Sequence, residues 1–379
     1  MCFFIIIISL SFLLFNNNSL QKIYFYIKSS IIIVNAGGKL MQKLIDAYGR
    51  PLENLRIAVT RECNYNCIFC HLEGDPIGKP QKIGTMPPEL TPYDYSIVAE
   101  AATKIGINEF KITGGEPLVR NDIIDIISNI RKYSENSDIS MTTNGYLLYT
   151  YAKKLKDSGL NRVNISIHSL NRETYYKITG VDGLEKALKG LDAALENGLK
   201  TKINASIVKG LNDREVMDLV EFSAKKGVTL QLIELQPINS GSKQFNNLHY
   251  PLSLIEEILI KKGAKIILRK LHNRPIYELP NGAIIEMVKS YNNPLFCAGC
   301  MRVRLLANGT LIPCINWGKP GVNLLPKIRN KPRDIAIKNT IEAFKEVNML
   351  RKPYVLYRLD TTQYASNSRE IRLKIPKKL

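Results

Sequence analysis

Between residues 55 and 262 the chain alternates short apolar runs with longer stretches whose apolar residues recur every three or four positions. The short runs predict buried strands, and the longer spacing predicts amphipathic helices. The predicted strands are Leu55–Thr60, Glu109–Thr113, Ile139–Thr143, Arg162–Ile167, Thr201–Val208 and Leu230–Leu235. The predicted helices are Tyr93–Ile105, Asp122–Tyr133, Tyr151–Ser158, Leu184–Glu196, Asp213–Lys226 and Leu252–Lys262.

Polar and glycine residues mark the expected ends of these helices. Asn121 and Asn212 stand where N-cap residues belong. Glycines suited to closing a helix are Gly106, Gly159, Gly198 and Gly227. Regular alternation of strands and helices predicts an α/β fold with a parallel sheet. Periodicity does not separate an open doubly wound sheet from a partial barrel, but both bind ligands at the carboxyl ends of their strands.

Residues able to carry chemistry follow the predicted strands. Cys63 comes after the first strand, Gly114-Gly115-Glu116 after the second and Asn144-Gly145 after the third, while Ser166 and Gln236 lie at the ends of the fourth and sixth. Because the carboxyl ends of parallel strands share one edge, we expect these residues to lie together there.

The alternation stops after Gly263 and gives way to sequence rich in Pro and Gly. We therefore expect a first domain over residues 41–263, a smaller cap over 264–350 and a tail over 351–379. Residues 1–40 differ from all of these, with two apolar patches at 3–15 and 23–34. No basic segment precedes them, and neither reaches the roughly 20 apolar residues of a spanning helix. We expect residues 1–40 to be a doubtful N-terminal extension upstream of a true start at Met41, with a weak membrane anchor as the alternative.

The charge balance is strongly basic, with 53 Lys and Arg against 34 Asp and Glu and a formal net charge of +19. Such an excess favours anionic partners, either nucleic acid or a small polyphosphate. The basic residues are dispersed along the chain, however, with no unbroken run longer than a pair. Charge therefore does not choose between these partners.

Six of the seven cysteines form two triplets, C-x3-C-x2-C at Cys63, Cys67 and Cys70, and C-x2-C-x13-C at Cys297, Cys300 and Cys314. A closed structural zinc site takes four ligands, and neither triplet has a fourth Cys or His at a suitable spacing. Disulfides would need an oxidising compartment, and nothing else resembles a small secreted domain. Three thiolates suit a cubane iron–sulfur cluster with one iron left open, which can bind a substrate or cofactor.

The first triplet after a first strand, followed by Gly114-Gly115-Glu116-Pro117 after the second, resembles the radical S-adenosylmethionine (SAM) superfamily. The resemblance covers roughly residues 50–240 and implies a partial (β/α)6 TIM-like barrel with a C-terminal cap that carries the second cluster. It also implies that a [4Fe–4S] cluster on Cys63, Cys67 and Cys70 binds SAM. The implied SAM-binding residues are Phe69, Gly115, Glu116, Ser166 and Gln236.

The second triplet, with Arg302-Val303-Arg304 and the Thr142-Thr143-Asn144-Gly145 segment, resembles the GTP 3′,8-cyclase family. This implies a second [4Fe–4S] cluster that faces the guanine of GTP, and a reaction that joins ribose C3′ to guanine C8 at the start of molybdenum cofactor biosynthesis. The implied GTP-binding residues are Arg56, Lys111, Thr142, Lys202, Arg302, Val303 and Arg304. Arg302 and Arg304 share one face of an extended segment, and arginine forks suit a triphosphate. Lys111 taken alone fits a solvated surface charge.

The resemblance also implies partners: an external reductant such as ferredoxin or flavodoxin, and a downstream cyclic pyranopterin monophosphate synthase. It leaves a homodimer open and implies no nucleic acid, no membrane and a cytoplasmic location, because such clusters are sensitive to oxidation. Two other classes stay as alternatives. One is a peptide-modifying radical enzyme, and the other is a basic metal-containing nucleic-acid-binding protein.

Several positions depart from the family pattern. Glu62 precedes the first cysteine, where bacterial members usually have arginine. Gln231 and Gln236 stand where those members carry arginine and methionine. The chain ends in Arg372–Leu379 instead of the Gly-Gly tail that the family commonly has. We interpret His71, His168, His249 and His272 as ordinary residues without a ligand or acid–base role.

Overall fold

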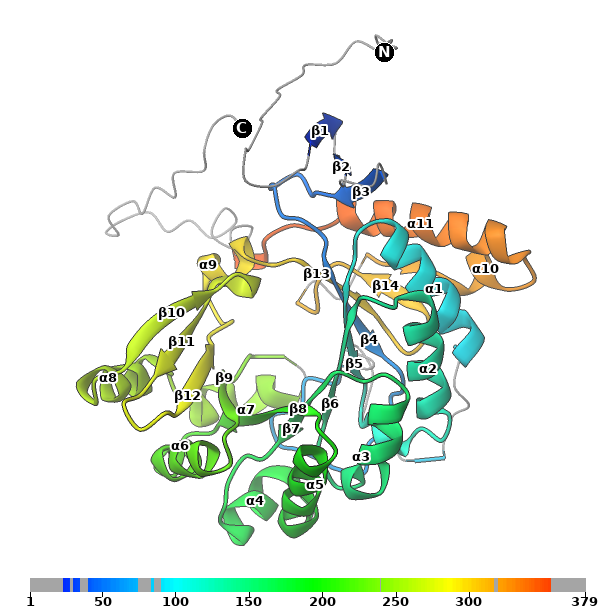
Figure 1. Ribbon diagram of the computed structural model, residues 1–379. Coiled ribbons are helices and arrows are strands. Elements are labelled where there is room, and N and C mark those ends of the chain that lie inside the picture. Colours follow the sequence, from blue (N-terminus) through cyan, green and yellow to red (C-terminus); the bar gives the residue numbers. More distant parts are fainter. Residues whose placement is uncertain are drawn as a thin grey trace, which may run out of the picture.

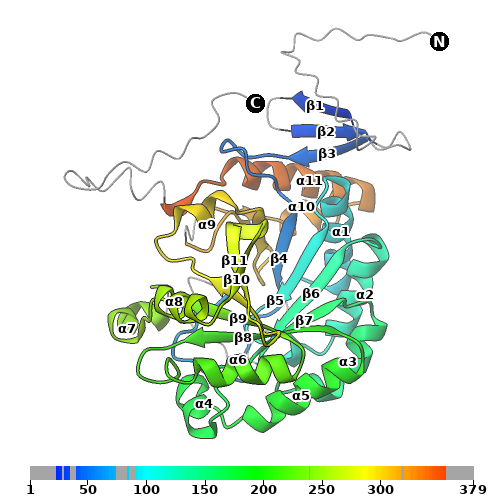
Figure 2. The ribbon, with the colours of Figure 1, turned by 60° about the vertical axis from the view of Figure 1, so that its left-hand side comes forward.

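The computed structural model in Figure 1 describes residues 23–27, 30–34, 40–73, 83–84, 90–238, 240–316 and 320–355. Its main feature is a strongly curved sheet with helices on the outside (Figures 1 and 2). The sheet has twelve strands in the order β10-β11-β12-β9-β8-β7-β6-β5-β4-β13-β14-β15. It is an open sheet, so the α/β partial barrel expected from the sequence is confirmed.

Six strands form the centre of the sheet as parallel neighbours in chain order. They are β4 (Asn54–Ala58), β5 (Glu109–Thr113), β6 (Asp138–Thr143), β7 (Arg162–Ser166), β8 (Lys200–Ile207) and β9 (Thr229–Glu234). Each lies within one or two residues of the predicted bounds. These strands could be predicted from their apolar runs because helices cover one face of the sheet and bury the apolar side chains there.

The C-terminal segment continues this sheet at both edges. On one side β12 (Ile284–Val288) pairs parallel to β9 and is followed outward by β11 (Arg274–Glu278) and β10 (Lys265–Arg269). On the other side β13 (Arg302–Leu305) pairs parallel to β4 and is followed by β14 (Thr310–Ile312) and β15 (Val322–Asn323). Figure 1 shows the two extensions facing one another across the open side of the barrel. The cap is therefore built from strands of the same sheet.

Helices cover the convex face of the sheet (Figure 2). Those between the central strands are α1 (Pro92–Lys104), η1 (Pro117–Val119), α2 (Ile123–Tyr133), α3 (Leu148–Asp157), α4 (Arg172–Thr179), α5 (Leu184–Glu196) and α6 (Val216–Lys225). Later in the chain come α7 (Ser240–Leu248), α8 (Ser253–Lys261), α10 (Leu325–Ile328) and α11 (Arg333–Met349). Two short helices, η2 (Leu271–Asn273) and α9 (Pro294–Ala298), lie instead at the cavity on the inner side. The long α11 packs against α1 and α10, which anchors the C-terminal segment to the barrel.

Side chains alternate between two environments along each central strand. On β5, Phe110 and Ile112 are fully buried in the apolar core beneath the helices. Their neighbours Glu109, Lys111 and Thr113 line a cavity on the inner face. The inner face of this barrel is therefore polar and hollow, whereas side chains fill the interior of a complete barrel of this type.

The observed helix ends test the N-cap residues and glycine terminators predicted from the sequence. Gly106, Gly159, Gly198 and Gly227 adopt positive φ angles of 83°, 98°, 67° and 65°, so the four predicted terminators are confirmed. The two predicted N-caps are wrong, because α2 and α6 begin after Asp122 and Glu215. Asn212 is instead fully buried and ties a loop together, donating to the carbonyls of His168 and Ser206 and accepting from Val208 N.

The strands β1 (Ile23–Ile27), β2 (Ser30–Val34) and β3 (Leu40–Leu44) form a separate antiparallel sheet. β3 spans Met41, and the chain runs on from it toward β4. Within the described ranges, no helix combines the length and apolar character that crossing a membrane requires.

Candidate functional site

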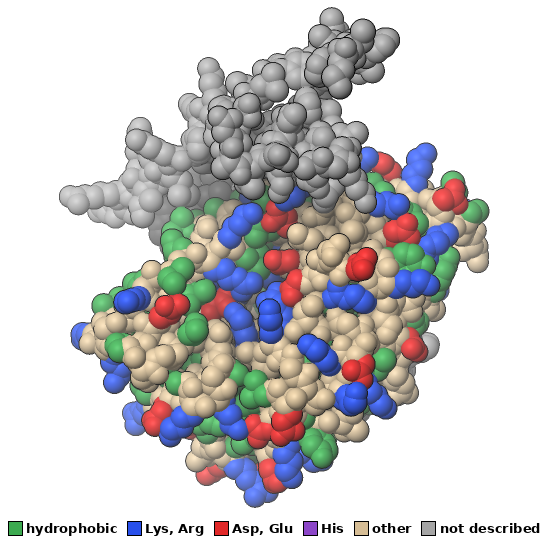
Figure 3. All heavy atoms as spheres, viewed as in Figure 1, with side chains coloured by type: hydrophobic (Ala, Val, Ile, Leu, Met, Phe, Trp, Pro, Cys, Tyr) green, Lys and Arg blue, Asp and Glu red, His purple; other side chains and the backbone are tan. Residues whose placement is uncertain are grey.

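One cavity of about 380 Å³ occupies the polar interior of the barrel. Figure 3 shows Lys and Arg side chains gathered around a hollow at the centre of this face. All six cysteines of the two triplets line the cavity, as do the SAM- and GTP-binding residues expected from the sequence, apart from Val303. Its lining includes eleven Lys or Arg and four Glu side chains, so the cavity is suited to an anionic ligand.

The first triplet lies in the loop that follows β4. Cys63 Sγ accepts a hydrogen bond from Tyr65 N at 3.4 Å, and Cys70 Sγ accepts one from Leu72 N at 3.4 Å. Burial raises the pKa of Cys63 to about 12 and raises the pKa of Cys67 and Cys70 as well. Thiols in such surroundings stay protonated unless a cation stabilises the thiolate, and iron bound at the triplet would supply that charge.

The Gly-Gly-Glu segment after β5 packs directly against this loop. Gly115 N donates to Thr60 O at 2.9 Å, and Glu116 N donates to Glu62 O at 2.8 Å. A Cβ atom at Gly115 would lie 2.1 Å from Glu62 O, so only glycine allows this close approach. The segment thereby sets the position of the loop that carries the first triplet.

The Glu116 carboxylate is almost completely buried and accepts three hydrogen bonds. They come from Thr143 Oγ1 at 2.6 Å, Asn144 N at 2.7 Å and Leu118 N at 3.1 Å. Burial nevertheless raises the pKa of Glu116 to about 7, against these three bonds. The carboxyl group therefore changes its charge near neutral pH.

We expect the affinity for SAM to rise as the pH increases through about 7. Glu116 carries a full negative charge only above its pKa, and only the ionised form attracts the ammonium group of SAM strongly. Equilibrium dialysis between pH 6 and pH 8 measures this change. The Glu116→Gln variant cannot ionise, so its weaker binding should be flat across the range, and an equally steep rise in that variant would contradict the assignment.

The remaining expected SAM contacts lie around the same end of the cavity. The Phe69 ring packs edge-on against His168, with centroids 5.0 Å apart. Ser166 is half-buried on β7 in register with Asn204, and Gln236 Nε2 donates to Ser290 Oγ. His168 lines the cavity beside them, and its Nδ1 accepts a hydrogen bond from Ser206 N at 3.1 Å.

The second triplet lies at the opposite end of the strands. Cys297 belongs to α9, Cys300 stands two residues before β13, and Cys314 stands two residues after β14. β13 runs parallel to β4 with Arg302 opposite Asn54, so Cys300 lies near the N-terminal edge of β4. Cys63 follows the C-terminal edge of the same strand. The cavity thus runs from one triplet to the other.

Two buried arginines hold the backbone of the second triplet. Arg50 Nη1 donates to Cys297 O at 3.0 Å, and Arg351 Nη2 donates to Cys300 O at 2.6 Å. Arg351 Nη1 also donates to Arg50 O at 3.1 Å and lies 3.5 Å from Asp46 Oδ2. This clamp connects the end of α11 to the cysteine loop.

Replacing Arg351 with alanine should lower the free energy of unfolding by about 3 kcal/mol, because the carbonyl oxygens of Arg50, Pro51 and Cys300 lose a charged donor. The variant should also lose iron from the second triplet while the first stays loaded. Urea unfolding and iron analysis measure the two effects. Lys345→Ala, in the last turns of α11, is the matched control, and a variant of Arg351 that resembles it would show that the clamp is dispensable.

A group of cations occupies the middle of the cavity. Arg304, Arg56 and Lys111 are neighbours in register on β13, β4 and β5, and Arg302 Nε donates to Asn54 Oδ1 at 2.9 Å. Lys111 is not a solvated surface charge, because its Nζ donates to Met141 O at 3.1 Å inside the cavity.

Burial weakens the charged form of each of these groups. It lowers the pKa of Arg56 and of Arg302 to about 10 and that of Arg304 to about 9. The pKa of Lys111 is also lowered, first by burial and then by repulsion from Arg56, Arg162 and Arg302. Glu73 is a carboxylate partner that Arg56 and Arg304 share. An anionic ligand would relieve the repulsion that remains.

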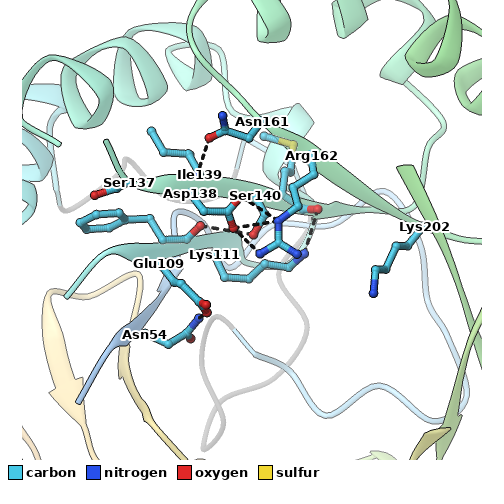
Figure 4. A network of polar contacts seen from close by, with 12 residues as sticks. Asn54, Glu109, Lys111, Ser137, Asp138, Ile139, Ser140, Asn161, Arg162 and Lys202 are labelled. Atoms are coloured by element: carbon cyan, nitrogen blue, oxygen red, sulfur yellow. Dashed lines mark hydrogen bonds and ion pairs between the residues drawn. The ribbon is translucent and has the colours of Figure 1, made fainter. Parts of the chain in front are cut away.

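Further polar and charged side chains line the cavity that the sequence analysis did not assign to it. Figure 4 shows Arg162 on β7 near Lys111, with Lys202 on the other side of the same space. Arg162 Nε pairs with Asp138 Oδ1 at 2.8 Å. The others are Asn164, Asn204, Arg269, His272 and Arg274. The available signal was a polar residue at every second position of the predicted strands.

Three expectations need a separate account. Val303 is fully buried on the outer face of β13, so its side chain does not reach the cavity between Arg302 and Arg304. Gln231 is buried on β9 and lines the cavity as a neutral group. The tail Arg372–Leu379 lies outside the described residues.

The two triplets fit iron–sulfur clusters by the chemistry of their surroundings. Each has three buried or half-buried thiols at one end of the cavity, and backbone N–H groups donate to sulfur in the first. In the part of the chain that the structure describes, no three His, Cys, Asp or Glu side chains are arranged to hold a single metal ion. A cubane needs a wider arrangement, because each thiolate binds a different iron.

Comparison with known proteins agrees with this geometry. The family model of the radical SAM superfamily matches residues 57–223, and that of Molybdenum Cofactor Synthesis C matches residues 228–354. The fold resembles SuiB of Streptococcus suis, whose crystal structure contains S-adenosylmethionine, with a TM-score of 0.54 and 16% identity over 78% of this chain and 68% of that one. Fold and site together define a radical SAM enzyme.

Curated relatives identify the family within this class. A probable GTP 3′,8-cyclase of Aeropyrum pernix is 42% identical over 337 residues, which cover 88% of this chain and 94% of the relative. A probable GTP 3′,8-cyclase of Thermococcus kodakarensis is 41% identical over 316 residues, covering 82% and 99%. The chain belongs to the GTP 3′,8-cyclase family.

Proposed function

We propose that this chain is a GTP 3′,8-cyclase (a lyase) that converts GTP to (8S)-3′,8-cyclo-7,8-dihydroguanosine 5′-triphosphate, the first step of molybdenum cofactor biosynthesis. The observation that carries the proposal is one continuous cavity with a cysteine triplet at each end and half-buried cations between them. Such a cavity can hold two ligands at once, one at each triplet, with an anionic group in the middle. The relatives' names support GTP as the second ligand.

In this proposal each triplet holds one [4Fe–4S] cluster, and the first also holds SAM. When bound, the first cluster and SAM supply the one-electron reductive cleavage that removes a hydrogen atom from the substrate. Glu116 accepts hydrogen bonds from the amino group of SAM, and the Phe69 ring covers the adenine. Gly115, Ser166 and Gln236 complete this half of the cavity.

GTP then lies along the other half, with its guanine toward Cys297, Cys300 and Cys314. The cationic side chains bind the triphosphate, while Thr142 lies on β6 between the two halves. The residues that carry the positive charge are Arg56, Lys111, Lys202, Arg302 and Arg304. Because the protein holds both ligands in one cavity, ribose C3′ lies near the SAM end. This positioning is what the protein contributes to the rate of the reaction.

The bond changes balance with two electrons and one proton. The C3′–H bond breaks, its hydrogen leaves on 5′-deoxyadenosine, and the C3′–C8 bond forms. One electron is consumed in cleaving SAM to methionine, and a second electron with a proton completes N7 of the product. An external reductant such as ferredoxin or flavodoxin supplies both electrons in this proposal, and a cyclic pyranopterin monophosphate synthase consumes the product. A cytoplasmic location suits the oxidation-sensitive clusters.

The test is an anaerobic reconstitution of the full chain with iron and sulfide, followed by SAM, dithionite and GTP. About eight irons per chain are expected for two cubanes. Mass spectrometry should find the cyclised product, and 5′-deoxyadenosine should form only when GTP is present. Deoxyadenosine formation that is indifferent to GTP would remove GTP as the substrate, and zinc in place of iron would overturn the proposal.

A further inference from the structure

The hairpin of β10 and β11 brings two arginines into the cavity from the C-terminal segment. Arg269 and Arg274 are direct cross-strand partners, and both line the cavity. Like charges directly opposite one another weaken an antiparallel pair. The turn between them adds strain, because His272 and Asn273 adopt positive φ angles of 61° and 48°. Both the strain and the charge repulsion destabilise the hairpin, and such destabilised features are concentrated at ligand-binding sites.

One buried carboxylate holds the pair in place. Glu286 on β12 is completely buried, and its Oε1 lies 2.8 Å from Arg269 Nη1 and 3.1 Å from Arg274 Nε. Its other oxygen, Oε2, lies 2.6 Å from Lys202 Nζ. Burial opposes ionisation of Glu286, but Arg274, Arg269 and Lys202 outweigh it and hold its pKa below the ordinary value. Among the residues that the structure describes, these three cations share one carboxylate, which leaves two positive charges without a counter-ion.

The two guanidinium groups also keep unused hydrogen-bond donors. Each guanidinium has five N–H donors. Arg274 contacts its protein partners through Nε, and Arg269 contacts its partner through Nη1. Among the described residues, the other guanidinium nitrogens of both side chains have no protein acceptor. His272, in the turn between them, is 4% exposed, and its Nδ1 has no partner in the described part of the chain. These donors lie where a ligand can use them.

The position of Arg274 connects this group with the cations of β4 and β13. The pKa of Arg274 is lowered to about 9, first by burial and then by repulsion from Arg269, Arg302 and Arg56, although Glu286 opposes the effect. Arg274 therefore lies close enough to Arg302 and Arg56 for their charges to act on it. An anion bound between the two sides of the open barrel would neutralise both groups at once.

We propose that Arg269 and Arg274, oriented by Glu286, bind phosphate oxygens of the substrate's triphosphate and so select a nucleoside triphosphate over the nucleoside. The inference rests on the proposed function and adds the β10–β11 hairpin to the substrate-binding residues. Two guanidinium groups side by side suit a polyphosphate, because each can form a bidentate pair with a phosphate group.

The test measures anaerobic binding of GTP and of guanosine to the reconstituted full chain by equilibrium dialysis. Arg269→Gln and Arg274→Gln should each weaken GTP binding about 10- to 100-fold, the effect of losing charge-assisted hydrogen bonds. Guanosine binding should stay within about twofold. Arg274→Lys should recover part of the GTP affinity, because it keeps the charge without the fork. The expected loss is smaller at high salt, where charge contributes less.

The control is Arg172→Gln, an exposed arginine paired with Asp182 on the outer surface, which should bind both ligands as the unmodified chain does. Iron content confirms that each variant is folded and loaded. Equal losses for GTP and guanosine would show a purely structural role and overturn the inference, as would an unchanged GTP affinity. If the unmodified chain itself does not bind GTP, the proposed function fails together with the inference, so the two failures are distinguishable.

Discussion

In the presence of GTP, the Cys63→Ser variant is expected to form no 5′-deoxyadenosine, whereas Cys300→Ser, which keeps the cations that bind the triphosphate, should still cleave SAM but make no cyclised product. Each substitution removes one of three ligands from a single cubane, so each variant should keep about four irons per chain of about eight. The different outcomes follow from the geometry, because Cys63 and Cys300 lie at opposite ends of the cavity. Iron analysis and chromatography of the nucleoside products measure both effects.

Cys2 belongs to neither triplet, so Cys2→Ser controls for the loss of a thiol and should keep full iron content and activity. A Cys300→Ser variant that still makes the cyclised product would show that the second triplet is not part of the substrate site. A Cys63→Ser variant that still cleaves SAM would place SAM elsewhere.

The Arg302→Ala and Arg304→Ala variants are each expected to weaken GTP binding about 10- to 100-fold while both clusters stay intact. Both guanidinium groups project from alternate positions of β13 into the cavity, and both are half-buried among other cations. Arg304 also pairs with Glu73, so its loss leaves that carboxylate with Arg56 and His71 as partners and reduces the attraction for an anion further. Calorimetry with GTP under anaerobic conditions provides the measurement.

Val303→Ala is the informative control for this pair. Val303 lies between the two arginines but packs in the apolar core on the opposite face, so its truncation should lower stability by about 1–2 kcal/mol and leave GTP affinity nearly unchanged. A loss of GTP affinity in Val303→Ala comparable with that of Arg302→Ala would mean that β13 binds GTP through its backbone position and not through its arginine charges.

Local sequence was sufficient for the centre of the fold. The six parallel strands follow from short apolar runs, and the four helix terminators follow from glycines that adopt positive φ. The first triplet and the Gly-Gly-Glu segment were also identifiable, because each directly follows a strand and the carboxyl ends of parallel strands meet. Each of these features depends on residues that are close together in the chain, so the spacing of residues in the sequence is enough to predict their local structure.

The pairing of the C-terminal strands could not be derived in this way. β12 joins β9 and β13 joins β4, so residues from the end of the chain line both sides of the opening. No periodicity indicates such edge pairing, because it depends on which strand edges remain free after the central sheet has formed. The helix caps failed for a similar reason, since Asn212 makes its hydrogen bonds within a buried loop.

The positive charge of the cavity shows most clearly which properties follow from the sequence alone and which depend on the tertiary structure. The sequence has a net charge of +19 spread evenly along its length, and nothing in that distribution separates Lys111 from a surface lysine. In the folded chain, Arg56, Lys111 and Arg304 become neighbours because three strands from distant segments align in register. Their burial together raises the energy of each charge, and it is this shared desolvation, a property of the assembled sheet, that makes the cavity a site for an anion.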